Sequence, residues 1–189
     1  QVTGHEPLAI WDVADWLRRN APPDSEVTLC HGDFRPGNVL FAGMDTPVIS
    51  GVLDWETAFL GDPLTELGYL LLRWRDDGDW TPPTGELEAR YPADVVAELR
   101  NPAPPGVAPF TGAPGSPTRR ELLARYEEQS GRTVEHERFY RALAAFVLAA
   151  VWADLDRHRV EAGGEPSRAP RVDYLSLVAD GIASGAFER

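Results

Sequence analysis

Three oxygen-bearing side chains near the start of the chain stand out by their type and spacing. Asp33 and Asn38 lie in the segment HGDFRPGN at 31–38, and Asp54 follows in the segment LDWE at 53–56. A kinase needs one carboxylate to orient the attacking hydroxyl and two oxygen ligands to hold the magnesium that bridges the phosphates, since catalysis is mostly positioning and charge neutralisation. The three side chains are candidates for these three roles.

A β-hairpin is the element that must bring two of these side chains together. Its neighbourhood is expected to contain short strands at 26–30, 39–41 and 48–53. The segment 31–37, with its Pro-Gly pair, predicts a turn-rich loop, and 43–47 predicts the hairpin turn. Because the hairpin reverses the chain, Asp54 at its end is expected to lie beside Asn38 at its start. The two side chains can then bind one metal ion.

Helical periodicity and capping signals predict that the rest of the chain is mostly helical. The expected helices are 7–20, 63–74, 118–130, 134–161 and 173–187. A capping box from Thr118 to Glu121 opens the third of them, and Gly131 stops it. The second is expected to pack under the turn-rich loop. The Pro- and Gly-rich stretches 76–85 and 101–117 are expected to be irregular connections.

The pattern of residues resembles the aminoglycoside phosphotransferase family. The hallmark of that family is His-Gly-Asp, four further residues, Asn, and then a metal-binding Asp beyond a short β-hairpin. The likeness continues through LGDPLTELGYLL at 60–71 and PTRRELLARY at 117–126, and with the Asp-Trp-Glu triplet it points to the bacterial branch related to the kinase domains fused to some acyl-CoA dehydrogenases. The resemblance implies an α+β, mostly helical fold, the C-terminal lobe of the protein-kinase-like fold.

The resemblance also implies a role for each residue of the motif. Asp33 orients the substrate hydroxyl and accepts its proton, while Asn38 and Asp54 bind the Mg²⁺ that accompanies ATP. Arg35 stands two positions after Asp33, where protein kinases place a phosphate-facing lysine. Its side chain either stabilises the transferred phosphate or forms a surface salt bridge.

Three further residues are expected to support the motif rather than react. His31 is expected to brace the loop, although a histidine beside an aspartate also suggests a general base. Glu56 is either a partner behind the metal ligands or a packing carboxylate. Asp62 is expected to accept backbone hydrogen bonds that hold the catalytic loop.

The chain contains no lysine, because all 18 of its Lys and Arg residues are arginines. A complete kinase of this family supplies a lysine from an N-terminal β-lobe to pair with the ATP phosphates. Residues 1–189 are therefore expected to form a single C-terminal lobe, with the catalytic loop and metal hairpin at 27–56 and a helical substrate side at 62–189. The nucleotide-binding N-terminal lobe is expected to be absent, which would leave this chain inactive by itself.

Composition narrows the class of protein and its partners. The chain is 43% hydrophobic and 25% charged, as expected for a globular domain, and its net charge of −12 disfavours nucleic acid as a partner. The longest apolar run, 142–153, is shorter than the roughly 20 residues that span a bilayer, so a buried helix is expected there and no membrane partner. A single cysteine, Cys30, fits a reducing, cytoplasmic compartment.

The favoured hypothesis is an ATP-dependent small-molecule kinase that transfers the γ-phosphate to a hydroxyl group. Its acceptor would be an aminoglycoside-like compound, a hydroxyacyl compound or another hydroxylated metabolite, because a fold does not fix a substrate. One alternative is a non-catalytic pseudokinase or binding module, which the missing lysine favours. A second is a metal-dependent hydrolase that uses the same Asp and Asn residues and releases phosphate without an acceptor.

Overall fold

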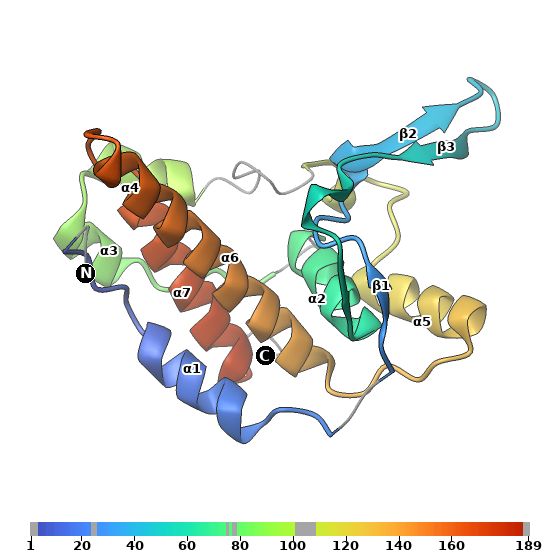
Figure 1. Cartoon of the computed structure of the whole chain (residues 1–189), viewed down its shortest axis with the longest axis horizontal. Helices are drawn as coiled ribbons and strands as arrows, with labels where there is room; N and C mark the ends of the chain where they lie inside the picture. The colour runs from blue at the N-terminus through green and yellow to red at the C-terminus, as the bar shows by residue number, and fades with distance from the viewer. Residues whose placement is uncertain (1–3, 24–25, 75, 77–78, 101–108, 187–189) are drawn as a thin grey trace.

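The computed structural model describes residues 4–23, 26–74, 76, 79–100 and 109–186 (Figure 1). The helices in these ranges are α1 (Ile10–Arg19), α2 (Pro63–Arg73), α3 (Gly85–Arg90), α4 (Ala93–Leu99), α5 (Arg119–Ser130), α6 (Glu137–Glu161) and α7 (Ala169–Ala183). The strands are β1 (Thr28–Cys30), β2 (Val39–Ala42), β3 (Val48–Val52) and β4 (Phe59–Gly61). Short 3₁₀ turns are η1 (Pro36–Asn38), η2 (Trp55–Thr57) and η3 (Pro109–Gly112). The expected α+β, mostly helical class is confirmed.

The core of the molecule is formed by α1, α3 and α4 together with α6 and α7, and the last two run side by side (Figure 1). Ala142, Ala145 and Ala179 have no exposed surface, and side chains this small let the two helices approach closely. Helix α2 packs on α6 in the same way, because a Cβ on Gly68 would lie 2.6 Å from the carbonyl carbon of Tyr140. Close apolar packing of this kind contributes about 25 cal/mol per Å² removed from water.

The apolar run 142–153 is helical, as expected, but it is buried on one face only. Ala145 and Ala149 have no exposed surface, whereas Val147 and Val151 are 47% and 48% exposed. The alanines of this run therefore pack against the core, and its valines lie on the partly exposed face of α6. In the part of the chain that the structure describes, no helix has both the length and the apolar character needed to cross a membrane.

Two small antiparallel sheets stand beside the helices. Strands β2 and β3 form the expected hairpin, in which Val39 pairs with Val52 and Ala42 with Val48, and the hairpin extends away from the helical body (Figure 1). Strand β1 pairs with β4, from Thr28 opposite Gly61 to Cys30 opposite Phe59. Strand β4 was not predicted, because three residues are too few to show an alternating pattern.

The predicted helix boundaries are right to within a few residues, with two omissions. The capping box at Thr118 forms as expected, and Gly131 ends α5 in the left-handed conformation at φ 70°. Helix α7 begins at Ala169, earlier than expected. Helices α3 and α4 were missed, because they are too short to show a periodic stripe. Within the proline-rich stretch, 101–108 lie outside the described residues.

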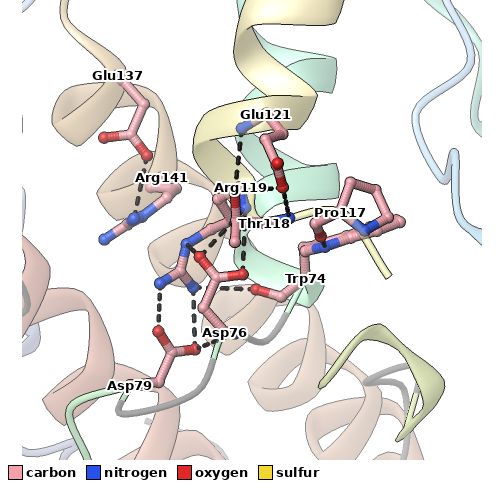
Figure 2. Close-up of polar contacts among 9 residues, drawn as sticks. All are labelled: Trp74, Asp76, Asp79, Pro117, Thr118, Arg119, Glu121, Glu137 and Arg141. Carbon is pink, nitrogen blue, oxygen red and sulfur yellow. Dashed lines mark hydrogen bonds and ion pairs between the residues drawn. The ribbon is translucent and has the colours of Figure 1, made fainter. Parts of the chain in front are cut away.

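A cluster of ion pairs and hydrogen bonds joins residues just after α2 to the start of α5 (Figure 2). The Arg119 side chain pairs with Asp79 and Asp76 and donates to the Trp74 carbonyl at 3.0 Å. The Asp76 carboxylate also accepts the Arg119 backbone N–H at 3.1 Å, which places an anion at the start of α5, where the helix dipole favours it. Trp74 in turn donates to the Pro117 carbonyl at 2.7 Å. This cluster ties Trp74, Asp76 and Asp79 to the start of α5.

Candidate active site

The motif at 31–38 forms a tight loop between β1 and β2 that only glycine permits at its second position. Gly32 has φ +85°, and a Cβ there would lie 2.3 Å from the Thr57 carbonyl oxygen. The Gly32 and Phe34 backbone N–H groups donate to the two carboxylate oxygens of Glu66, at 2.8 and 3.1 Å. Glu66 belongs to α2, so this helix lies against the loop as expected and holds it by hydrogen bonds.

The structure corrects the role expected for Asp62. Its carboxylate accepts the Leu64 N–H at 2.8 Å, as the N-cap of α2, and the Tyr140 hydroxyl at 2.5 Å. An N-cap side chain is committed to its own helix, whereas Glu66, one turn further along, reaches the loop. Sequence reasoning missed Glu66, because nothing local marks a carboxylate that acts on a loop more than thirty residues away.

His31 is buried and ties the loop to the end of β3. Its Nε2 lies 2.7 Å from the Leu53 carbonyl oxygen, and its Nδ1 lies 3.2 Å from the Asp33 backbone nitrogen. Because Nδ1 accepts the Asp33 N–H, Nε2 carries the ring proton and donates to Leu53. The ring also packs against Trp55, with centroids 4.6 Å apart. Both ring nitrogens are engaged, one within the loop and one with Leu53, which argues against a general base at this position.

The Asp33 carboxylate accepts three side-chain hydrogen bonds. Tyr69 donates to Oδ1 at 2.5 Å, while Arg35 Nε and Asn38 Nδ2 both donate to Oδ2 at 3.0 Å. Burial alone would raise the pKa of Asp33, but the hydrogen bonds from Tyr69, Arg35 and Asn38 together hold it below its ordinary value. Asp33 is therefore ionised at neutral pH and can accept a further hydrogen bond.

Tyr69 is a site residue that sequence reasoning missed. It lies on α2, and Arg73, one turn later, donates to its hydroxyl and lies 4.5 Å from the centre of its ring. Burial, followed by the hydrogen bond to Asp33, raises the pKa of Tyr69 to about 12, so its hydroxyl stays protonated. Its place in the segment 60–71 gave no signal, because aromatic residues on a helix usually pack in the core.

Arg35 is half-exposed and forms an ion pair with Asp33. Its Nε is 3.0 Å from Oδ2, and its side chain is 37% exposed. Both partners of this ion pair belong to the motif, so it is not an isolated surface salt bridge. Its guanidinium holds further N–H groups that are not needed for this contact.

Asn38 directly precedes β2 and Asp54 follows β3, so both residues lie at the base of the hairpin. The Leu53 N–H donates to the Asn38 carbonyl at 2.8 Å, which places Asp54 one residue from that contact. Asn38 is buried, and its amide nitrogen donates to Asp33, so its amide oxygen faces away from that contact. Asp54 is exposed and has φ 68°, a left-handed conformation that is uncommon outside glycine and is frequent at functional positions.

The donor set at the hairpin base suits Mg²⁺. Within the described ranges, no group hydrogen-bonds to the Asn38 amide oxygen or to the Asp54 carboxylate, and oxygen ligands of these two kinds are the ones Mg²⁺ prefers. No cluster of three or more His, Cys, Asp or Glu suited to a metal occurs among these residues. Two protein ligands agree with the usual coordination of Mg²⁺, which takes its remaining ligands from water and phosphates.

A cavity of about 550 Å³ opens beside the motif. Asp33, Asp54 and Glu56 line one side of it, and Glu56 is exposed on η2. Another part of its lining is an apolar stripe of α6, formed by Leu143, Val147, Leu148, Val151, Trp152 and Leu155. None of the described residues that line this cavity is basic. The cavity thus joins an acidic edge to an apolar wall, and the exposed valines of α6 belong to that wall.

Comparison with curated proteins identifies relatives in vertebrates. Acyl-CoA dehydrogenase family member 11 of Gallus gallus is 32% identical over 146 residues, 76% of this chain and 16% of that protein. The Mus musculus member 11 is 42% identical over 74 residues, 38% of this chain and 9% of that protein. Member 10 of Mus musculus is 28% identical over 137 residues. The chain thus spans only a small part of the length of these relatives.

Comparison with solved structures shows the same fold. The crystal structure of a "putative aminoglycoside phosphotransferase" from Ralstonia eutropha JMP134 superposes with a TM-score of 0.67 and 23% identity. The match covers 97% of this chain and 51% of that one. A family model described as the phosphotransferase enzyme family matches residues 2–110, which contain the whole motif and its hairpin. The chain therefore belongs to the phosphotransferase enzyme family.

Proposed function

We propose that this chain is the catalytic half of an ATP-dependent phosphotransferase that acts on the hydroxyl group of a small molecule. The observation that carries the proposal is the Asp33 carboxylate, which three donors hold at the edge of a cavity. Asn38 and Asp54, the candidate metal ligands, adjoin it at the base of the hairpin. A base, a metal-binding pair and a cavity for an acceptor are the parts that phosphoryl transfer requires.

The chain's residues can serve this reaction as follows. Asp33 accepts a hydrogen bond from the acceptor hydroxyl and takes its proton as the hydroxyl oxygen bonds to the γ-phosphorus. The bond from the γ-phosphorus to the β,γ-bridging oxygen breaks, and ADP leaves with the bonding electrons. Asn38 and Asp54 would hold Mg²⁺, which when bound neutralises phosphate charge. The N–H groups of Arg35 beyond its bond to Asp33 are candidates for contact with the transferred phosphate.

The cavity supports an acceptor that carries an apolar body beside its hydroxyl group. Its α6 wall is apolar, and a hydroxyacyl compound has such a body, whereas a polycationic aminoglycoside does not. The acidic edge at Asp54 and Glu56 does not favour a polycation by itself, because the Asp54 carboxylate is assigned to the metal. Among the acceptors compatible with the motif, the hydroxyacyl class fits this wall best.

A non-catalytic pseudokinase or binding module is the second candidate, and the absence of lysine is the observation that favours it. A kinase of this fold pairs a lysine with the ATP phosphates. In our proposal an N-terminal lobe of the natural protein supplies that lysine. The two candidates differ in one result, the formation of ADP when an alcohol is present.

The test is an assay of ADP formation by the natural full-length protein that carries this chain, with Mg²⁺, ATP and a panel of alcohols. The panel pairs short with long 3-hydroxy acids and includes an aminoglycoside. Asp33→Asn should lower the turnover by a factor of about 10² to 10⁴. Asp45→Asn, the same change in the exposed β2–β3 turn, is the matched control. Full turnover in Asp33→Asn would reject the assignment, and nucleotide binding without ADP formation would favour the pseudokinase.

A further inference from the structure

The Asp33 carboxylate has one hydrogen-bonding position left open, and its partners determine where that position is. An ionised carboxylate offers about four acceptor positions, two on each oxygen. Arg35 and Asn38 both donate to Oδ2, which fills the two positions of that oxygen. On Oδ1 the only donor among the described residues is the Tyr69 hydroxyl, at 2.5 Å. The open position is therefore on Oδ1, beside the phenol.

The Tyr69 hydroxyl is itself held in a fixed direction. A phenol has one proton to donate, and Arg73 donates into the phenolic oxygen from the next turn of α2. The proton of Tyr69 therefore goes to Asp33. The guanidinium of Arg73 also lies over the ring, 4.5 Å from its centre, so the ring plane is held as well. The raised pKa of Tyr69 agrees with a hydroxyl that remains a donor throughout the neutral range.

The cavity beside the motif places the acceptor on the same side. Tyr69 and Asp33 both line it, together with the apolar stripe of α6. An alcohol that enters this cavity meets Oδ1 next to the phenol, whereas Oδ2 is covered by Arg35 and Asn38. The phenol thus stands beside the one position where the acceptor hydroxyl can bind.

We propose that Tyr69 is a positioning residue that directs the acceptor hydroxyl to Oδ1 of Asp33 by occupying the other acceptor position of that oxygen. The inference rests on the proposed function, since it concerns the base of that reaction. It gives α2 a second task beside holding the loop through Glu66. Without the phenol, the carboxylate can rotate, and the hydroxyl has more than one way to approach it.

The test is Tyr69→Phe, which removes the hydroxyl and keeps the ring. Loss of a hydrogen bond to a charged group should lower kcat about tenfold or more, while the KM for MgATP stays unchanged because the metal side is not altered. In an Asp33→Asn background the same change should have no further effect on kcat, since the two residues act as one unit. Tyr91→Phe is the matched control, because Tyr91 donates to the buried carboxylate of Asp173 far from the motif, at 2.7 Å. It should lower thermal stability and leave kcat unchanged.

A second readout does not depend on turnover. In NMR spectra of the folded protein, the Arg35 Nε–H should exchange with water more rapidly in Tyr69→Phe than in the wild type, because the carboxylate that holds it becomes mobile. The Asn38 amide keeps its second hydrogen bond, to the Asp33 backbone carbonyl at 2.9 Å, so the metal side stays in place. Unchanged exchange would overturn the inference, as would an unchanged kcat or an effect that adds fully to that of Asp33→Asn. If exchange rises but no alcohol yields ADP in the wild-type protein, the positioning by Tyr69 stands and the proposed function fails.

Discussion

Asp33 and Asp173 are two carboxylates with similar partners and different surroundings. Each accepts a hydrogen bond from a tyrosine hydroxyl and one from an arginine. Asp173 has no exposed surface. Its four partners are Leu8 N–H at 3.0 Å, His5 at 3.0 Å, Tyr91 at 2.7 Å and Arg90 at 3.2 Å. Asp33 has three side-chain donors and remains 24% exposed at the edge of a cavity.

The difference distinguishes a structural carboxylate from a candidate base. Asp173 is saturated, and its partners come from the N-terminal segment and from the end of α3, so it ties both to α7. Asp33 is held nearly as firmly but has an open acceptor position toward a cavity. Burial and ionic partners are thus common to both sites, and incomplete saturation beside a cavity distinguishes the candidate base.

The largest effect should come from removing the candidate base, Asp33. Asp33→Ala should lower turnover of the full-length protein by at least about 10²-fold, because the proton acceptor is lost, while most of the affinity for MgATP remains. Steady-state kinetics and calorimetric titration with nucleotide measure the two quantities. Loss of nucleotide affinity in parallel with turnover would mean that Asp33 shapes the nucleotide site instead.

Removing the saturated carboxylate should damage the fold rather than the chemistry. Asp173→Ala leaves the Leu8 N–H and the Tyr91 hydroxyl without their acceptor inside the protein, and each buried unsatisfied group costs about 1–3 kcal/mol. We expect the free energy of unfolding to fall by about 3 kcal/mol, measured by urea denaturation. The kcat of the fraction that remains folded should not change. A large loss of kcat in the folded fraction of Asp173→Ala would contradict a purely structural role for Asp173.

The metal pair should affect nucleotide binding before it affects stability. Asp54 is exposed and makes no hydrogen bond or ion pair within the described ranges, so Asp54→Ala removes no internal contact. It should weaken Mg²⁺-dependent binding of ATP about tenfold or more, or about 1.4 kcal/mol, in calorimetric titrations with and without Mg²⁺. Equal affinities for wild type and variant with Mg²⁺ present would remove Asp54 from the metal site.

The smallest effect concerns a third carboxylate, Asp156, which is buried where α6 meets the segment before α7. Burial alone would raise its pKa, but hydrogen bonds from the Ser167 and Arg168 backbone and from the Arg168 side chain hold that pKa below its ordinary value. A lowered pKa stabilises the fold above the unfolded-state value of about 3.9, and this stability is lost as the pH falls through the folded-state value.

Thermal unfolding between pH 7 and pH 3 tests this expectation. Asp156→Asn should be less stable than wild type by about 1–2 kcal/mol at pH 7, and the difference should shrink below about pH 4. Asp45→Asn, in the exposed hairpin turn, is the control and should follow the wild-type curve. A difference between wild type and Asp156→Asn that stays constant down to pH 3 would contradict the assignment.

Local sequence signals predicted much of this fold and the centre of the site. Asp33 and Asn38 share one short segment, and the hairpin that returns Asp54 to them is encoded by two short β runs around a turn. Long helices such as α6 follow from periodicity and caps, and the capping box at Thr118 is a purely local device. These features depend on residues close together in the sequence, which is why they could be predicted.

The rest of the site depends on tertiary packing. Tyr69 and Glu66 reach the loop because α2 lies against it, and neither residue type indicates a partner more than thirty positions away. Asp62 is expected to accept backbone hydrogen bonds that hold the loop, yet its carboxylate oxygens bind the Leu64 N–H at the start of α2 and the Tyr140 hydroxyl. Strand β4 and helices α3 and α4 are too short to have a pattern of their own.

Gly68 shows how the dimensions of the site depend on a contact that lies outside it. Its missing side chain lets α2 rest directly on the backbone of Tyr140, on the face of α2 away from the loop. The distance between α2 and α6 therefore determines how far the adjacent Tyr69 and the nearby Glu66 reach toward the loop. A methyl group added at Gly68 would push α2 away from α6 and displace both side chains. Turnover should therefore respond to the bulk of residues that touch neither substrate nor metal.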